Sequence, residues 1–134
     1  MSTPFGPQLI GETEKTLVAL LRRFLAETGL TEPQWVTLRI AGQLEGAGDE
    51  QRLVAAVADR AHFPDAAELV EAVTSRGLVD DGRLTAAGRT TVTDLLARSE
   101  AVTGSIWADH PADDLAATTR VLNEVLTRAR RILA

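Results

Sequence analysis

Apolar residues in the first part of the chain recur at steps of three, four and seven positions, the spacing of one helix face. They are Ile10, Leu17, Leu20, Leu21, Phe24 and Leu25. Residues 1–8 contain Pro4, Gly6 and Pro7 and are expected to form a loose arm. Gly29 supplies a C-terminal stop signal. The pattern therefore predicts a first helix over about residues 8–28.

The next helix has the clearest local start signal in the sequence. In Thr31-Glu32-Pro33-Gln34, Thr31 can cap a helix, Pro33 fits its first turn, and Gln34 stands where a capping box has Glu or Gln. Trp35, Leu38 and Ala41 follow at helical spacing. The helix is expected to run out at the Gly46-Ala47-Gly48 stretch.

Two shorter helices are predicted after this stretch. Asp49 can cap the first, and Asp65 can cap the second. Their apolar positions are Leu53, Val54, Val57 and Ala58, then Leu69, Val70 and Val73. His62-Phe63-Pro64 separates them, and Arg76-Gly77 ends the second with a cation and a glycine.

The segment from Leu78 to Leu84 is predicted to form a very short β-hairpin, because Asp81-Gly82 is a favoured two-residue turn between apolar flanks. Thr85 can cap a long helix after the hairpin. His110-Pro111 interrupts the helical pattern, and a last helix is expected over about residues 112–134. Apolar residues continue at helical steps along both segments: Val92, Leu95, Val102, Ile106, then Leu115, Leu122, Val125, Ile132.

The 134 residues suit one domain, taken as residues 1–134, with 45% hydrophobic and 25% charged residues. The sequence contains no cysteine, which excludes disulfides, thiol catalysis and Cys-based metal sites. The longest apolar run, residues 17–21, is far too short for a membrane span, and no signal pattern begins the chain. No membrane contact and a cytoplasmic location are expected.

Three segments in this order resemble the MarR family of winged helix-turn-helix regulators. Leu30-Thr31-Glu32-Pro33-Gln34-Trp35 is similar to the start of the family's second helix. Arg76-Gly77-Leu78-Val79 is similar to the end of its recognition helix and the first wing strand. Arg83-Leu84-Thr85-Ala86-Ala87-Gly88 is similar to the segment that closes the wing and opens the fifth helix.

The resemblance implies a mainly α, six-helix fold with a short β-hairpin wing and an intertwined homodimer. The dimerisation helices would be about residues 8–28 and 112–134, and the winged helix-turn-helix lobe about residues 49–89. The implied function is a small-molecule-responsive transcriptional regulator that binds double-stranded DNA. The helix that starts near Asp65 would enter the major groove. The candidate DNA contacts of the lobe are Arg52, Arg76, Arg83 and Arg89.

The charge distribution argues against conventional DNA recognition. The whole chain has a formal charge of -5. In residues 49–89, five basic residues stand against eight acidic ones, so this lobe carries -3. Glu68 and Glu71 would face phosphates, and the short wing keeps only Arg83. The alternative is a homodimer that has lost DNA binding and acts as a small-molecule-binding protein or as an enzyme in a biosynthetic pathway.

Trp35 and Arg39 lie one helical turn apart and are the candidate ligand-binding residues. Relatives in the family bind small effectors in a cleft between the dimer helices and the winged lobe. An aromatic ring beside a guanidinium would suit a small aromatic or acidic ligand. The alternative is that Trp35 packs in the core and that Arg39 pairs with a glutamate of the first helix.

No catalytic constellation stands out in the sequence. If the cleft were catalytic, the candidate acids and bases would be Glu12, Glu14, His62 and His110. The two histidines have no second ligand at metal spacing, and they are expected to be turn and loop residues. The Gly46-Ala47-Gly48 stretch lacks the context of a dinucleotide-binding loop. No metal and no cofactor are expected.

Overall fold

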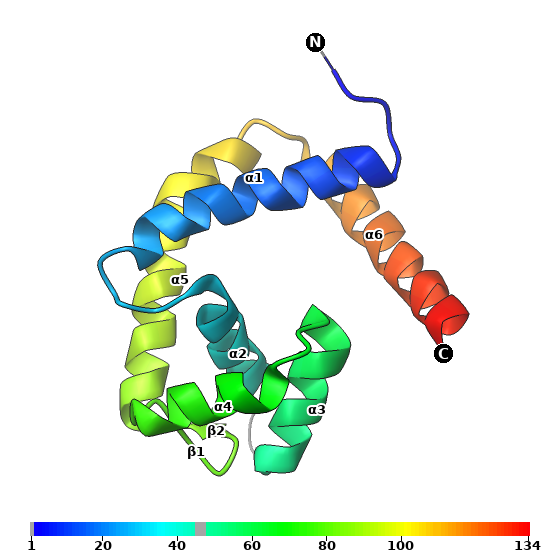
Figure 1. Ribbon diagram of the computed structural model, residues 1–134. Helices are drawn as coiled ribbons and strands as arrows, with labels where there is room; N and C mark the ends of the chain where they lie inside the picture. The colour runs from blue at the N-terminus through cyan, green and yellow to red at the C-terminus, as the bar shows by residue number, and fades with distance from the viewer. Residues whose placement is uncertain (1, 45–47) are drawn as a thin grey trace. The chain divides into compact units, whose positions relative to one another are not determined.

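The computed structural model describes residues 2–44 and 48–134. This part of the chain is mainly helical, with six helices and one two-stranded antiparallel sheet (Figure 1). The elements are α1 (Pro7–Leu25), α2 (Glu32–Gln43), α3 (Glu50–Ala61), α4 (Ala66–Ser75), β1 (Val79–Asp80), β2 (Arg83–Leu84), α5 (Ala86–Trp107) and α6 (Ala112–Leu133). The predicted order of helices and hairpin is confirmed.

Two predicted boundaries of α1 are wrong. The helix begins at Pro7, so Pro7 and Gln8 do not belong to a loose arm. Proline is tolerated at a helix start because its missing N–H would have no partner there. The helix ends at Leu25, before the expected limit at residue 28, and Gly29 with φ +73° follows in the connection to α2. The predicted end of α2 at Gly46 and Ala47 lies outside the described residues.

Two of the predicted N-caps are confirmed. At α2, the backbone N–H of Gln34 donates to Thr31 Oγ1 at 3.3 Å, and the N–H of Thr31 donates to Gln34 Oε1 at 3.1 Å. This reciprocal pair is a complete capping box. At α3, the carboxylate of Asp49 accepts from the N–H of Arg52 at 2.9 Å.

The capping prediction for Asp65 is wrong. Asp65 occupies the N-cap position of α4, but its side chain makes no capping hydrogen bond. Its backbone lies at φ -100° and ψ 33°, whereas Thr31 and Asp49 are extended. An extended N-cap backbone is the conformation that turns the side-chain oxygen toward the free N–H groups of the first turn.

The hairpin has the predicted turn. Val79 pairs with Leu84 and Asp80 with Arg83. Asp81 and Gly82, between the strands, have φ of 49° and 77°. Two consecutive positive φ values characterise the type I′ turn, whose twist matches that of the strands. The register is thereby fixed over only two residue pairs.

Thr85 joins the hairpin to α5 and caps that helix as predicted. Its hydroxyl accepts from the N–H of Gly88 at 3.0 Å and donates to the carbonyl of Gly77 at 2.6 Å. One side chain therefore satisfies a donor at the helix start and an acceptor at the end of the α4 connection.

The chain divides into two compact units, one ending at Ser99 and the other comprising Glu100–Ala134. In the first unit, α2, α3 and α4 pack against one another, with the hairpin beside α2 and α4 (Figure 1). Its core is aliphatic, apart from Trp35. The fully buried large side chains are Leu38, Leu53, Val57, Val70, Val73, Val79 and Thr37. The Thr37 hydroxyl donates to the carbonyl of Pro33 at 2.8 Å, which satisfies its polar group.

The second unit contains the end of α5 and all of α6. No residue of α6 is buried. Its large apolar side chains are 36–85% exposed: Leu115, Val121, Leu122, Val125, Leu126, Ile132 and Leu133. Within the described residues, no helix combines the length and the apolar character that crossing a membrane requires.

Candidate nucleic-acid interface

Helices α3 and α4 form the helix-turn-helix part of the first unit. His62 ends α3 in the left-handed region at φ 57°, and its N–H donates to the carbonyl of Ala58 at 3.1 Å. This conformation reverses the chain toward α4. The expectation that His62 is a turn residue is therefore confirmed.

The surface of α4 divides as the sequence predicted. Leu69, Val70 and Val73 are buried in the core. The exposed residues are Ala67, Glu68, Glu71, Thr74 and Ser75. Within the described chain, neither Glu68 nor Glu71 has a basic partner. The outer face of α4 therefore presents two uncompensated carboxylates.

Arg76 fastens the end of α4 to the connection between α1 and α2. Its Nη1 donates to the carbonyl of Gly29 at 3.0 Å, and its Nη2 donates to that of Thr28 at 3.2 Å. These carbonyls lie 47 and 48 residues away in sequence. Arg76 therefore has a bracing role that the sequence pattern did not reveal.

Arg83 and Arg89 are exposed, and each also holds a backbone carbonyl. Arg83 Nε donates to Gly48 O at 3.1 Å, which joins β2 to the residue before α3. Arg89 Nη1 donates to Leu84 O at 3.2 Å, which joins α5 to the hairpin. Arg52 is exposed on the first turn of α3, with its aliphatic chain beside Gly48. The structure thus places all four predicted arginines on one unit, three of them with bracing contacts.

The hairpin turn approaches the start of α3 closely. Gly82 is buried, and a Cβ added there would meet the carbonyl of Asp49 and lie 2.8 Å from the N of Glu50. Any larger residue would push the turn away from α3. The turn is therefore packed against α3, and it differs from the longer wing that the family resemblance implies.

Trp35 and Arg39 are together, as their spacing predicted, but in different environments. Trp35 is only 3% exposed and belongs to the core, whereas Arg39 is exposed. The Arg39 Cζ lies 5.9 Å from the centroid of the indole ring, in the range of a cation–π contact. A ligand on this ring would have to displace Arg39 or a core neighbour. The alternative ion pair of Arg39 with a glutamate of α1 does not form in the described chain.

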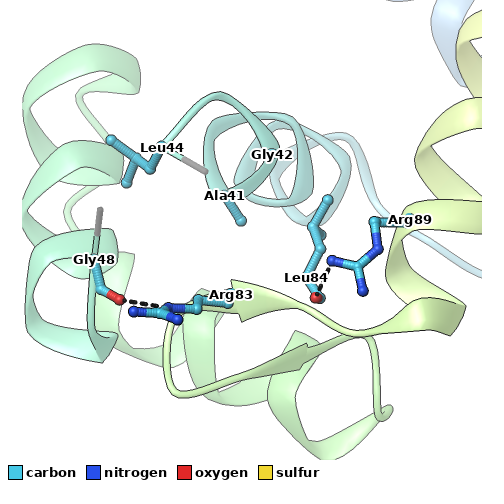
Figure 2. A pocket seen from close by; sticks show the side chains of 8 residues that line it. Ala41, Gly42, Leu44, Gly48, Arg83, Leu84 and Arg89 are labelled. Atoms are coloured by element: carbon cyan, nitrogen blue, oxygen red, sulfur yellow. Dashed lines mark hydrogen bonds between the residues drawn. The ribbon is translucent and has the colours of Figure 1, made fainter. Parts of the chain in front are cut away.

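A pocket of about 200 Å³ opens between the end of α2, the residue before α3, the hairpin and the start of α5 (Figure 2). It is lined by Ala41, Gly42, Leu44, Gly48, Gly82, Arg83, Leu84 and Arg89. The sequence reasoning named Arg83 and Arg89 only as DNA contacts. It missed the pocket because four segments that are separate in sequence build it.

The candidate acids and bases do not assemble into a catalytic group. Glu12 accepts hydrogen bonds from Thr3 Oγ1 at 3.0 Å and Gln8 Nε2 at 3.4 Å, and Glu14 is exposed on α1. His110 is exposed in the α5–α6 connection. Among residues 2–44 and 48–134, no three His, Asp or Glu side chains come together as a metal site.

Comparisons with protein-family models, curated proteins and solved structures gave no match to this chain. The MarR resemblance therefore stays a prediction that depends on the order of three sequence motifs. The order of the helices and the hairpin is consistent with a winged-helix class of fold.

Proposed function

We propose that this chain is a MarR-like transcriptional regulator that binds double-stranded DNA as a homodimer and responds to a small acidic molecule. The observation that carries the proposal is the helix-turn-helix arrangement of α3 and α4, followed by a hairpin and a long helix. In such an arrangement the second helix enters the major groove, and its outward side chains meet the bases. Thr74 and Ser75, both exposed on α4, are side chains that can contact base edges.

The arginines supply phosphate contacts in this proposal. Arg76, Arg83 and Arg89 each use a donor on a backbone carbonyl, which holds the side chain in one place. A guanidinium has five N–H donors, so a braced arginine loses less conformational freedom when it meets a phosphate. Arg52, at the start of α3, adds a fourth positive charge.

The proposed homodimer uses the apolar side chains of α6. They are exposed in the single chain, and a second copy would remove them from water. Two copies related by a twofold axis would also present two α4 helices, which suits a palindromic DNA site.

A second candidate function is a homodimer of the same fold that binds a small molecule and no DNA. Two observations favour it: the unpaired carboxylates of Glu68 and Glu71 on α4, and the close packing of the Gly82 turn against α3. Carboxylates repel phosphates, and a packed turn reaches less far into a minor groove.

Fluorescence anisotropy of a labelled duplex at 50–200 mM salt decides between the two candidates. A regulator binds random DNA with Kd of roughly 10⁻⁴–10⁻⁶ M at physiological salt, and the affinity falls steeply as salt rises. An Arg52→Gln variant is expected to reduce the salt slope by about 1. The matched control, Arg120→Gln on α6, leaves the slope unchanged.

The carboxylates of α4 give the same assay a second arm. In a regulator, the double variant Glu68→Gln, Glu71→Gln binds DNA more tightly, because two repulsive charges are removed, and Glu14→Gln on α1 has no effect. If the wild-type chain does not bind at 50 mM salt, the regulator is excluded and the second candidate takes its place.

A further inference from the structure

The pocket beside the hairpin combines an apolar floor with two positive charges. Ala41, Leu44 and Leu84 supply the aliphatic surface, and the backbones of three glycines complete the wall. Figure 2 shows the side chains of Arg83 and Arg89 on either side of Leu84, each with its guanidinium group at a backbone carbonyl. Among the described residues, no acidic side chain lines the pocket.

Hydrogen bonds orient the two arginines before any ligand arrives. Arg89 Nη1 is held by Leu84 O at 3.2 Å, and the other N–H groups of this guanidinium remain for a ligand. Arg83 brings a second positive charge, held by Gly48 O at 3.1 Å. A guanidinium matches the planar geometry of a carboxylate and forms charge-assisted hydrogen bonds with it.

The size of the pocket limits the ligand. About 200 Å³ corresponds to roughly seven water molecules at ~30 Å³ each, which is below the range of drug-sized sites. No aromatic side chain lines the described pocket, so its floor selects compact apolar shape and offers no stacking. An ion without an apolar part would leave Leu44 and Leu84 in contact with water.

We propose that this pocket binds a small monocarboxylate with a compact apolar body, such as a branched short-chain acid or a single-ring acid. The carboxylate meets Arg89, with Arg83 as the second charge, and the apolar body covers Leu44 and Leu84. This inference deepens the effector part of the proposed function and places the effector away from Trp35. It does not depend on DNA binding.

The pocket walls come from α2, the residue before α3, the hairpin and α5, so an occupant contacts four segments at once. Binding to the folded state alone raises the thermal midpoint of unfolding. The ligand is expected to act on the same contacts that hold the Gly82 turn beside α3.

The test is a titration of the full chain with benzoate and isovalerate, without DNA, followed by NMR of the backbone amides. We expect saturable shifts at Gly42, Gly82 and Leu84. The neutral amides, benzamide and isovaleramide, and inorganic phosphate are expected to bind at least tenfold more weakly. Phosphate bound as tightly as benzoate would overturn the proposal, since the site would then be a simple anion site.

Variants locate the site. Arg89→Gln is expected to raise Kd by roughly ten- to a hundredfold, the loss of one charge-assisted contact. Arg98→Gln on the same helix is the matched control and keeps the wild-type Kd. If Arg39→Gln abolishes binding while Arg89→Gln does not, the ligand binds beside Trp35 and the proposal is wrong. No saturable shift up to about 10 mM of either acid would also overturn it, and DNA binding would then still be decided by its own assay.

Discussion

The lobe formed by α2, α3 and α4 and the C-terminal helix α6 have similar helical patterns of apolar residues but different burial. In the lobe, Leu38, Leu53 and Val70 are completely buried. In α6, no residue is buried, and Leu122 is 38% exposed. The difference teaches that helical spacing predicts an apolar face without saying what covers it. In the lobe the cover comes from the same chain, and for α6 we propose a second copy.

The largest expected effect separates these two regions. Leu53→Ala leaves a cavity in the lobe and should lower the free energy of unfolding by about 2–5 kcal/mol. Chemical denaturation followed by circular dichroism measures it. The loss should be the same at every protein concentration, because the cavity lies within one chain.

Leu122→Ala on α6 is the matched control. Its effect should depend on protein concentration, because the side chain is covered only in the dimer. An equal loss for both variants at all concentrations would remove the distinction between the regions.

The packing of the hairpin turn gives the next effect. Gly82→Ala should destabilise the chain by about 3 kcal/mol, since a Cβ there meets the backbone of Asp49 as well as a positive φ. Gly77 has a similar φ of 75° with open space around it, so Gly77→Ala should cost only about 1 kcal/mol. Thermal unfolding of both variants checks this. Equal losses would mean that the turn is not packed against α3.

The brace formed by Arg76 gives a smaller effect. Arg76→Met removes both hydrogen bonds to the carbonyls of Thr28 and Gly29 and should lower stability by about 1 kcal/mol. Arg52→Met, whose guanidinium has no such contact, should change stability by less than about 0.5 kcal/mol. Hydrogen exchange at residues 28–30 should rise only in the first variant, and unchanged exchange would argue against the brace.

Exposed ion pairs give the smallest effect in both regions. Arg98 lies 4.0 Å from Glu27 in the first unit, and Arg128 lies 3.8 Å from Glu124 in the second. All four side chains are more than half exposed, so Glu27→Gln and Glu124→Gln should each cost at most about 0.5 kcal/mol. A larger loss for Glu124→Gln in the unfolding curve would indicate that its pair is covered by another chain.

Local signals in the sequence predicted most of the fold. The Thr31–Gln34 capping box and the Asp81-Gly82 turn involve only neighbouring residues, so the sequence carries them directly. The capping prediction for Asp65 was wrong because the residue type does not determine its backbone angles. The element order thus follows from the sequence, while the ends of α1 do not.

The candidate sites were less predictable than the fold. The exposed face of α4 with Glu68 and Glu71 followed from helical spacing. The contact from Arg76 to Gly29 did not, because it joins residues 47 positions apart. The pocket at Arg83 and Arg89 likewise depends on tertiary contacts between four segments. Spacing placed Trp35 and Arg39 together but could not show that the ring belongs to the core.

Sedimentation velocity of the full chain over a range of concentrations tests the central claim, that a second copy covers α6, most directly. The account predicts a species of about twice the 14.3 kDa of one chain. The double variant Leu122→Glu, Val125→Glu should sediment as a monomer and keep a helical circular dichroism spectrum. A wild-type chain that stays monomeric at every concentration would contradict the account.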